Sequence, residues 1–384
     1  MKEDSTASTT LYFISRYRKS PFFEATQRAG CKAYGVYNHM YLPKYYDDPV
    51  AEYWHLVNHV TLWDVGVERV VEITGPDASV FINMLTPRDL TKCAIGQGKY
   101  VLITAEDGGI INDPVLSRIG ENRWWLALAD SDAGLWARGV AINSGLDVTV
   151  REPDIYPVQV QGPKSKDVMT ALFGDSVLDI RYYWNREADL DGIPVIICRT
   201  GYTGELGYEI YLQDPSAGGT LWNRIMEAGE PYDIRPIAPC SARRVEAGIF
   251  SYGADMTIQN NAFEITGLER LVEDQAADYI GKEALMRIKA EGVKRKLVGI
   301  EIEGEPWMIE PVEPLLAYRN GKPVDRVTVV IWSPRLEKNI GYVWVPIELA
   351  DPGTVLDVET SQGTVKARIA SLPFLDPKKV VPKL

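Results

Sequence analysis

The chain of 384 residues carries a formal net charge of −12, from 41 basic and 53 acidic side chains. This acidic balance argues against nucleic acid and anionic membranes as partners, because both attract a positively charged surface. Hydrophobic residues make up 46% and charged residues 24%, the composition of a folded protein rather than a disordered one. No apolar run reaches the roughly 18–20 residues that a membrane span requires. The length leaves room for two or three packed domains.

The N-terminal segment and the cysteines bear on the cellular compartment. Residues 1–13 contain no basic stretch followed by an apolar one, so we expect no secretory signal and a cytoplasmic protein. The cysteines are too few and too scattered for a disulfide framework, and no C-x-x-C pair suggests a metal. We expect free thiols at Cys31, Cys93, Cys198 and Cys240.

Two histidines, His55 and His59, are four residues apart in a predicted helix and therefore share one of its faces. Such a pair can bind a metal ion, but no acidic or thiol third ligand is near it in the sequence. We therefore expect the two rings to serve in packing and the protein to bind no metal.

A repeated sequence pattern, called the echo below, indicates two related halves. Residues 70–86 and 157–173 both read as an alternating strand, then Gly-Pro, then an amphipathic helix. Glycine allows the turn after the strand, and proline is tolerated at the first position of a helix. Strand-Gly-Pro-helix is also a common connection, so the echo alone leaves duplication open. It favours an α+β body of two related α/β lobes.

The rest of the chain supports this α+β assignment. Strands are expected at 100–107, 123–130, 193–200 and 207–212, and helices at 133–145, 218–229 and 238–249. From about residue 290, short strands alternate with NG, PG and QG turns, which predicts a separate all-β module. We expect a two-lobed body over 1–286, with lobe cores at about 64–150 and 151–286, and a C-terminal all-β domain over 287–384.

Three short segments carry side chains suited to ligand binding. The first places paired glycines and the carboxylate of Asp113 at a strand end, where backbone can approach a ligand closely. The second, 199–209, crowds glycines and tyrosines before Glu209, whose carboxylate can accept two N–H bonds side by side. In the third, Arg244 lies on a predicted helix and could bind a carboxylate. Each also has an ordinary structural explanation.

Together these segments identify a resemblance to the aminomethyltransferase family, the glycine-cleavage T-proteins. Matching blocks occur in the family's order along nearly the whole chain, which is very improbable by chance. They are WDVG (63–66), ITGPDA (73–78), GGIIND (108–113), QGPKS (161–165), RTGYTGELGYEI (199–210), RRVEAG (243–248), DYIGKEAL (278–285), RKLVGIEIEG (295–304) and SPRLEKNIG (333–341). The resemblance implies a ring-like three-domain fold with a central folate site, in which the C-terminal domain over 287–384 is a β-barrel.

The resemblance also implies roles for individual residues. Asp113 matches the family's active-site aspartate, which faces the folate nitrogens, and Glu209 matches the glutamate that binds the pterin edge. Tyr202 and Tyr100 match pocket tyrosines, and Arg244 matches the arginine of the family's L-R-L-E-A-G helix. We therefore expect Asp113 and Tyr202 to be catalytic and all five residues to bind tetrahydrofolate.

Departures from the T-protein pattern concern the substrate. The family's D-V-S-H-M reads D-V-G-V-E at 64–68, and Cys240 occupies the place of an arginine in its A-R-D-S-L-R-L-E helix. Its V-T-S-G-T-x-S-P reads V-T-V-V-I-W-S-P at 327–334. We therefore do not expect the lipoyl carrier protein that partners a T-protein. The oligomeric state, including a homodimer, stays open.

A narrower resemblance points to the dimethylsulfoniopropionate demethylase branch of the family. It is carried by YNHMYLP (37–43), YWHL (53–56), WDV (63–65) and LADSD (128–132), whereas residues 261–274 depart from that branch. It implies transfer of a sulfonium methyl group to N5 of tetrahydrofolate, without flavin or metal. Aromatic faces would hold the cation. We expect Trp184 and Trp332 to form this cage with Tyr202 and Tyr100, and His39 to be a further substrate contact.

Three alternatives remain at this point. An O-demethylase of aromatic methyl ethers would need a proton donor, such as Tyr202 or a histidine, for its poorer leaving group. An aminomethyl or N-methyl transferase is the second; its flavin-linked form should carry G-x-G-x-x-G, which does not occur here. The third is a non-catalytic folate-binding protein. Such relatives carry a cysteine in the block that here reads DYIGKEAL (278–285).

Overall fold

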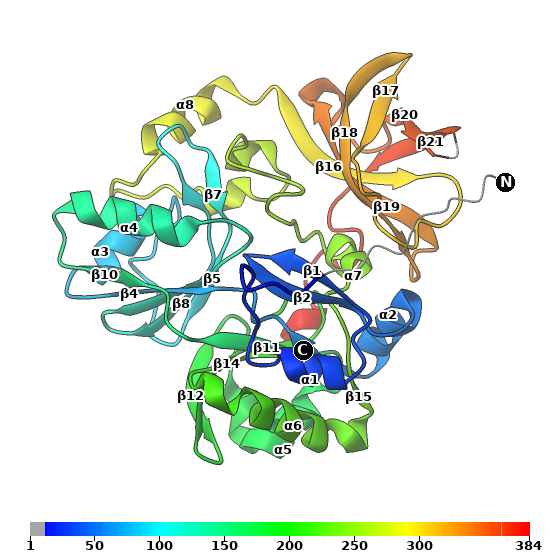
Figure 1. The fold of residues 1–384 in the computed structure, drawn as a ribbon. Coiled ribbons are helices and arrows are strands. Elements are labelled where there is room, and N and C mark those ends of the chain that lie inside the picture. Colours follow the sequence, from blue (N-terminus) through cyan, green and yellow to red (C-terminus); the bar gives the residue numbers. More distant parts are fainter. Residues whose placement is uncertain (1–11, 362) are drawn as a thin grey trace.

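The computed structural model describes residues 12–361 and 363–384. Most of the N-terminal segment on which the expectation of no secretory signal rests lies outside the described residues. Figure 1 shows three bodies arranged around a central region: two lobes built of sheets and helices, and a barrel near the C-terminus. No helix among the described residues is both long and apolar enough to cross a membrane.

The N-terminal part of the chain contributes a helix, a hairpin and a second helix. In the second helix Pro49 occupies the first turn, and the Asp48 side chain accepts hydrogen bonds from the backbone N–H groups of Val50 and Ala51. The bounds are α1 (Phe23–Arg28), β1 (Ala33–Tyr37), β2 (Met40–Tyr45) and α2 (Pro49–Asn58).

The first lobe is a five-stranded sheet with strand order β10-β4-β9-β8-β5, and it carries the helices α3 and α4. A short hairpin, β6–β7, leads to the segment that holds Asp113. The bounds are β4 (Val70–Thr74), α3 (Ala78–Met84), β5 (Gly98–Tyr100), β6 (Ile103–Thr104), β7 (Ile110–Asn112), β8 (Val115–Gly120), β9 (Arg123–Ala127), α4 (Ala133–Ser144) and β10 (Thr149–Arg151).

The second lobe is a six-stranded sheet with order β12-β13-β14-β11-β3-β15, packed against α5 and α6. Its strand β14 is buried along its whole length and carries Glu209. The bounds are β3 (Val60–Asp64), β11 (Tyr156–Gln161), α5 (Ser165–Phe173), β12 (Asn185–Leu190), β13 (Ile193–Cys198), β14 (Gly207–Leu212), α6 (Gly218–Gly229) and β15 (Ile234–Pro236).

The two lobes repeat one arrangement, as the echo in the sequence predicts. In each sheet the first of four strands, counted in chain order, pairs with the fourth, the fourth with the third, and the third with the second. In the first lobe this order is β4-β9-β8-β5, and in the second it is β11-β14-β13-β12. The glycines of the echo are equivalent too: Gly75 and Gly162 have φ of +125° and +117°, and a Cβ on either would strike backbone oxygen. The helices begin at Ala78 and Ser165, two residues after the prolines rather than at them.

One strand breaks the symmetry between the lobes. β10 pairs directly with β4, whereas β3 is inserted between β11 and β15. β3 precedes the whole first lobe in the chain, yet it belongs to the sheet of the second lobe. The second sheet is therefore built from segments that lie on both sides of the first lobe in the sequence.

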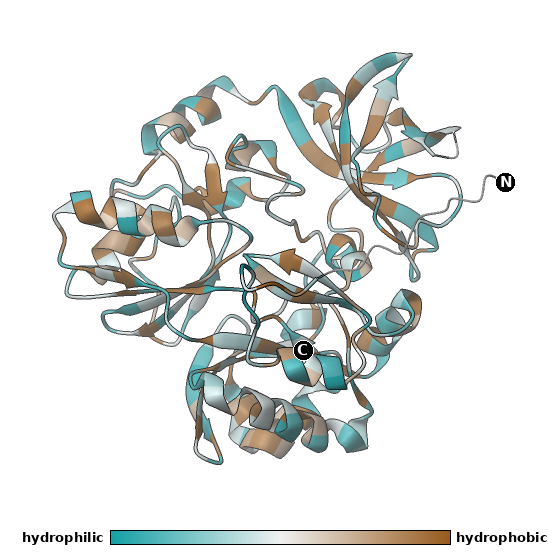
Figure 2. Cartoon of the chain, viewed as in Figure 1, coloured by the Kyte–Doolittle hydropathy of each residue, from teal (hydrophilic) through white to brown (hydrophobic). Residues whose placement is uncertain are grey.

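The C-terminal strands close into a six-stranded barrel, which confirms the predicted α+β fold with a C-terminal β-barrel. Hydropathy alternates along many of its strands and along the lobe helices, so that one face packs on a core (Figure 2). The bounds are α7 (Ser241–Glu246), α8 (Lys282–Glu291), β16 (Arg295–Ile302), β17 (Leu315–Arg319), β18 (Lys322–Ser333), β19 (Lys338–Pro346), β20 (Val355–Thr360) and β21 (Gly363–Ala370).

The last residues leave the barrel and return to the lobes. Leu375 N donates to Glu246 O at the end of α7, and the Arg199 guanidinium donates to the backbone oxygen of Leu384. The C-terminal segment therefore forms part of the wall of the central cavity described next.

Candidate active site

A cavity of about 530 Å³ lies where the two lobes, α7 and the C-terminal segment meet. This volume falls within the range of small-molecule sites, roughly 300–1,000 Å³. Four of the predicted site residues line it together: Asp113 and Tyr100 from the first lobe, and Tyr202 and Glu209 from the second. Segments far apart in the sequence therefore meet at one site, as the resemblance requires.

Asp113 has one free oxygen in this site. Its Oδ2 accepts a hydrogen bond of 2.8 Å from the Tyr100 hydroxyl, whereas its buried Oδ1 has no partner among the described residues. Burial raises the pKa of Asp113 to about 7. A buried acceptor without a donor is costly, so the geometry favours a ligand that brings an N–H or O–H group to Oδ1.

Tyrosines, rather than tryptophans, form the aromatic wall. Tyr37, Tyr182, Tyr183 and Tyr252 line the cavity beside Tyr100 and Tyr202. Burial raises the pKa of Tyr202 to about 12, so its hydroxyl stays protonated near neutral pH. The hydroxyl donates a long hydrogen bond of 3.4 Å to the carbonyl oxygen of Phe250, and such a high pKa makes it a weak proton donor in catalysis.

Glu209 lies in the wall of the cavity with its carboxylate already oriented by the protein. Oε2 accepts hydrogen bonds of 2.8 Å from the hydroxyls of Thr200 and Tyr211, and Oε1 accepts one of 2.9 Å from the Gln159 amide. Each carboxylate oxygen can accept two hydrogen bonds, so Oε1 keeps a free lone pair. Glu209 can therefore accept a ligand N–H without losing its internal bonds.

Buried carboxyl groups line the cavity beside the ion-paired Arg243, and exposed basic groups line other parts of it. Asp113 and Glu209 are buried, whereas the side chains of Arg270, Lys379 and Lys383 also line the cavity but belong to exposed residues. A ligand with N–H donors on its inner part and negative charge on its outer part matches this distribution.

Four predicted site residues lie elsewhere. Arg244 does not line the cavity; it is 4% exposed and is held by Asp255 at 2.9 Å and by Ile249 O. His39 is exposed at the tip of the β1–β2 hairpin. The expected contacts of Arg244 and His39 with ligand therefore find no support in the geometry.

The two tryptophans of the predicted cage lie outside the cavity. Trp184 lies against the core of the second lobe, with the Arg181 guanidinium 3.8 Å above its ring. Trp332 lies on the barrel strand β18, where its backbone pairs with Trp307. Neither is among the residues that line the cavity. An aromatic ring can pack in a core as well as in a ligand site, so residue type alone did not decide their location.

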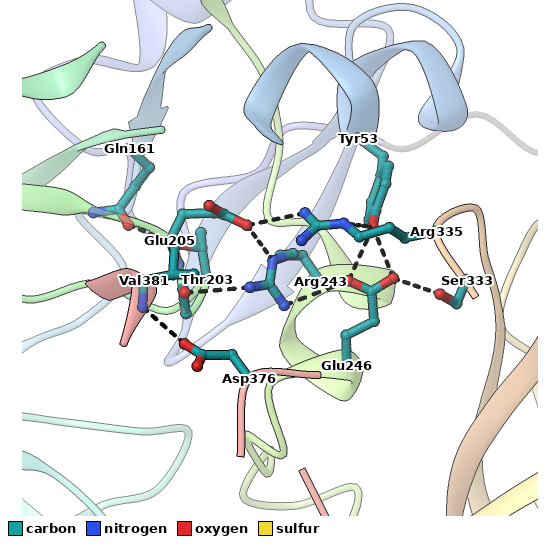
Figure 3. A network of polar contacts seen from close by, with 11 residues as sticks. Tyr53, Gln161, Thr203, Glu205, Arg243, Glu246, Ser333, Arg335, Asp376 and Val381 are labelled. Carbon is teal, nitrogen blue, oxygen red and sulfur yellow. Dashed lines mark hydrogen bonds and ion pairs between the residues drawn. The ribbon is translucent and has the colours of Figure 1, made fainter. Parts of the chain in front are cut away.

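An ion-pair network joins α7 to the surrounding bodies (Figure 3). Arg243 donates to Glu205 at 2.7 Å and to Glu246 at 3.4 Å, and Arg335 of the barrel also reaches Glu205 at 3.1 Å. The Tyr53 hydroxyl of α2 donates to Glu246 at 2.8 Å. These bonds tie α2, the second lobe and the barrel to one wall of the cavity.

The histidine pair has a third neighbour that the sequence did not reveal. Asp233 lies beside His55 and His59, so the expectation that no acidic group is near them is wrong. The two rings are stacked with an interplanar angle of 11°, and Arg235 pairs with the Asp233 carboxylate at 3.2 Å. Parallel rings do not direct their lone pairs to a common point, so this arrangement is one of packing and ion pairing.

Sequence reasoning missed several residues of the site. Glu68, Tyr37 and the basic residues Arg270 and Lys379 all line the cavity. Glu68 could have been noticed, because it is the charged residue in the block where the T-protein pattern has methionine. Tyr37 lies in the block YNHMYLP (37–43), which carried the resemblance without pointing to a role for it, and Arg270 and Lys379 lie in segments without a matching block.

Comparison with known proteins identifies the family of this chain and agrees with its fold. The model of the GCVT N-terminal domain matches residues 22–275, and that of the glycine cleavage T-protein C-terminal barrel domain matches residues 295–376. The chain belongs to this family. The fold agrees: the glycine cleavage system aminomethyltransferase T from Bartonella henselae superposes with a TM-score of 0.84 at 23% identity, covering 93% of this chain and 98% of that one.

Curated relatives of this family are similar over nearly their whole length. Dimethylsulfoniopropionate demethylase of Ruegeria pomeroyi is 38% identical, covering 91% of this chain and 94% of the relative. The aminomethyltransferase of Bacillus subtilis is 31% identical, covering 93% and 99%. The chain is therefore an enzyme of the T-protein family, a folate-dependent transferase.

Proposed function

We propose that this enzyme transfers a methyl group from a small sulfonium compound, such as dimethylsulfoniopropionate, to N5 of tetrahydrofolate. The observation that carries the proposal is Asp113, which lines a cavity of suitable volume and whose buried Oδ1 has no partner among the described residues. The 38% identity to the demethylase of Ruegeria pomeroyi supports the sulfonium donor.

The charge distribution of the cavity fits tetrahydrofolate. A pterin ring offers N–H donors, which Asp113 and Glu209 can accept in the buried interior. The glutamate tail is anionic, and in this proposal it lies beside Arg270, Lys379 and Lys383, the exposed cationic residues that line the cavity. Cationic side chains in a chain of net charge −12 are well suited to guide an anionic ligand to this opening.

The chemistry requires orientation more than acid catalysis. The bond from sulfur to the methyl carbon breaks as the bond from N5 to that carbon forms, and the electron pair stays on sulfur as a neutral thioether. Holding the two reactants in line can contribute about 7–11 kcal/mol. The N5 proton must then leave, and Asp113, whose burial raises its pKa to about 7, is suited to accept it.

The tyrosine wall suits a sulfonium cation. Each aromatic face can contribute about 0.5–2 kcal/mol to binding a cation. Tyr37 and Tyr202 lie close enough to Asp113 for its charge to affect the pKa of both hydroxyls. We place the methyl donor beside this group, and the raised pKa of Tyr202 disfavours the ether alternative, which needs a ready proton donor.

The direct test is to incubate the purified protein with tetrahydrofolate and a matched panel of sulfonium, aryl methyl ether and N-methyl compounds. We expect 5-methyltetrahydrofolate and a thioether to form in equal amounts from the sulfonium compound. Turnover of an ether or amine, with no product from sulfonium compounds, would overturn the donor assignment. Failure to bind tetrahydrofolate at all would overturn the proposed function.

A further inference from the structure

Two carboxyl groups lie together in the interior of the cavity without a cation between them. The Gln159 amide nitrogen is 2.9 Å from Oε1 of Glu209 and 3.4 Å from Oε1 of Glu68. Both glutamates line the cavity. Like charges this close strongly disfavour double ionisation, so one proton is expected to remain on the pair near neutral pH.

The donors around the pair decide which glutamate keeps the proton. Glu209 accepts three hydrogen bonds, from Gln159, Thr200 and Tyr211, and these stabilise its charged form. Glu68 receives only the long contact from Gln159, and its Oε2 has no hydrogen bond from the described residues. Glu209 is therefore the carboxylate and Glu68 the acid.

The electrostatic surroundings agree with this assignment. Burial, followed by the charge of Glu209, raises the pKa of Glu68 well above its ordinary value. The charged and titratable groups that face Glu68 are Glu209 and Tyr211 from β14 and Tyr37 from β1, and none of them is cationic. Glu68 is only partly buried, since it borders the cavity, so its Oε2 is accessible to a ligand.

We propose that Glu68 is a second pterin-binding residue, acting as a neutral acid whose O–H donates to an acceptor nitrogen of the ring. This inference rests on the proposed function. A pterin carries N–H donors on one side of its amino group and the acceptor nitrogen N1 on the other. The Glu209 carboxylate matches the donor side, and a protonated Glu68 matches the acceptor side. Glu68 would thus be a positioning residue that fixes the ring in one orientation.

Two substitutions separate this role from simple packing. Glu68→Gln keeps the shape and still offers an N–H donor, so we expect its dissociation constant for tetrahydrofolate to stay within about threefold of wild type. Glu68→Met introduces the T-protein residue, which has no donor, and should weaken binding about 10- to 100-fold. Glu121→Gln, at an exposed residue outside the cavity, is the matched control. Calorimetric titration measures each constant, and melting temperatures show whether each variant is folded.

The pH dependence gives a second readout. As pH rises through the raised pKa of Glu68, the acid ionises, loses its donor and repels Glu209. Wild-type affinity should therefore fall with rising pH, whereas the affinity of Glu68→Gln should vary less. The same comparison with a tail-free tetrahydropterin shows that the effect lies on the ring and not on the glutamate tail.

Three outcomes would overturn the inference. One is equal loss of affinity in Glu68→Gln and Glu68→Met, which would mean that the ionised carboxylate is needed. Another is unchanged folate affinity with an altered KM for the methyl donor, which would place Glu68 beside the donor. The third is unchanged affinity in every variant. A wild-type protein that binds no tetrahydrofolate would instead overturn the proposed function, so the two failures are distinguishable.

Discussion

Two sets of buried carboxyl groups in this protein have different surroundings. Glu205 and Glu246 are joined to Arg243 within the network of Figure 3. Asp113 and Glu209 line the cavity without any cation bonded to them, and each keeps acceptor capacity free. Buried charge that is paired holds the bodies together, whereas buried charge left unpaired is available to a ligand. The four predictions below test this contrast.

The largest effect is expected at Asp113. Asp113→Asn removes the acceptor for the N5 proton while keeping the shape, so kcat for methyl transfer should fall about 100- to 10,000-fold. Initial rates of 5-methyltetrahydrofolate formation measure this. Asp154→Asn, at an exposed residue outside the cavity, should retain wild-type rates. A fall of less than about tenfold at Asp113 would contradict its assigned role.

In the paired region the effect should be on stability. Arg243→Ala leaves Glu205 and Glu246 with fewer partners in a buried site, and such a loss typically costs about 3–5 kcal/mol of unfolding free energy. Denaturant unfolding measures it. Arg224→Ala breaks an exposed ion pair with Asp191 and should leave the midpoint nearly unchanged. Equal effects in the two variants would show that the α7 network does not brace the structure.

In the cavity, unlike in the α7 network, the ionised carboxylate should destabilise the folded protein. The pKa of Asp113 rises on folding from 3.8 to about 7, so its stabilising contribution is complete below about pH 4 and disappears as pH rises to 7. Without ligand at pH 8, Asp113→Asn should therefore unfold at a higher temperature than wild type. Its unfolding free energy should be higher by a few kcal/mol, about 1.4 kcal/mol for each unit of pKa shift. The gap should close near pH 4. A variant less stable than wild type at pH 8 would mean that Asp113 contributes to stability there.

The smallest effect is expected at the basic opening. Lys379→Ala and Lys383→Ala should each weaken binding of tetrahydrofolate only a few-fold, because exposed charge pairs are screened by solvent and salt. The loss should grow with a polyglutamate tail and shrink at high salt. Lys378→Ala is the neighbouring control, since Lys378 does not line the cavity. Equal losses for tailed and tail-free ligands would place the tail elsewhere.

Local patterns predicted the fold and part of the site. The repeated strand-Gly-Pro-helix led to the two lobes, because each glycine adopts a positive φ where a Cβ would strike backbone. Turn dipeptides predicted an all-β C-terminal domain, and the family resemblance predicted that it is a barrel. Asp113 and Glu209 were found because each lies in a glycine-rich motif that matches the family, and both line one cavity.

The other residues of the site depend on contacts between distant segments. Glu68 faces Glu209 only because β3, which leads into it, pairs with β11 in the second sheet. Tyr37 reaches the cavity from the N-terminal hairpin, and Lys379 reaches it from the C-terminal segment. Trp184 and Trp332 do not line the cavity, and residue type alone does not distinguish a core ring from a ligand cage.

The insertion of β3 into the second sheet limits how the chain can be divided. A fragment that begins after residue 151 would lack the strand between β11 and β15, leaving both with unpaired edges and an apolar face uncovered. During synthesis, residues 60–64 must wait until β11 has emerged, while the intervening first lobe can already fold. Gene fusions or circular permutants that keep 60–64 covalently linked to the second lobe should therefore be the viable ones.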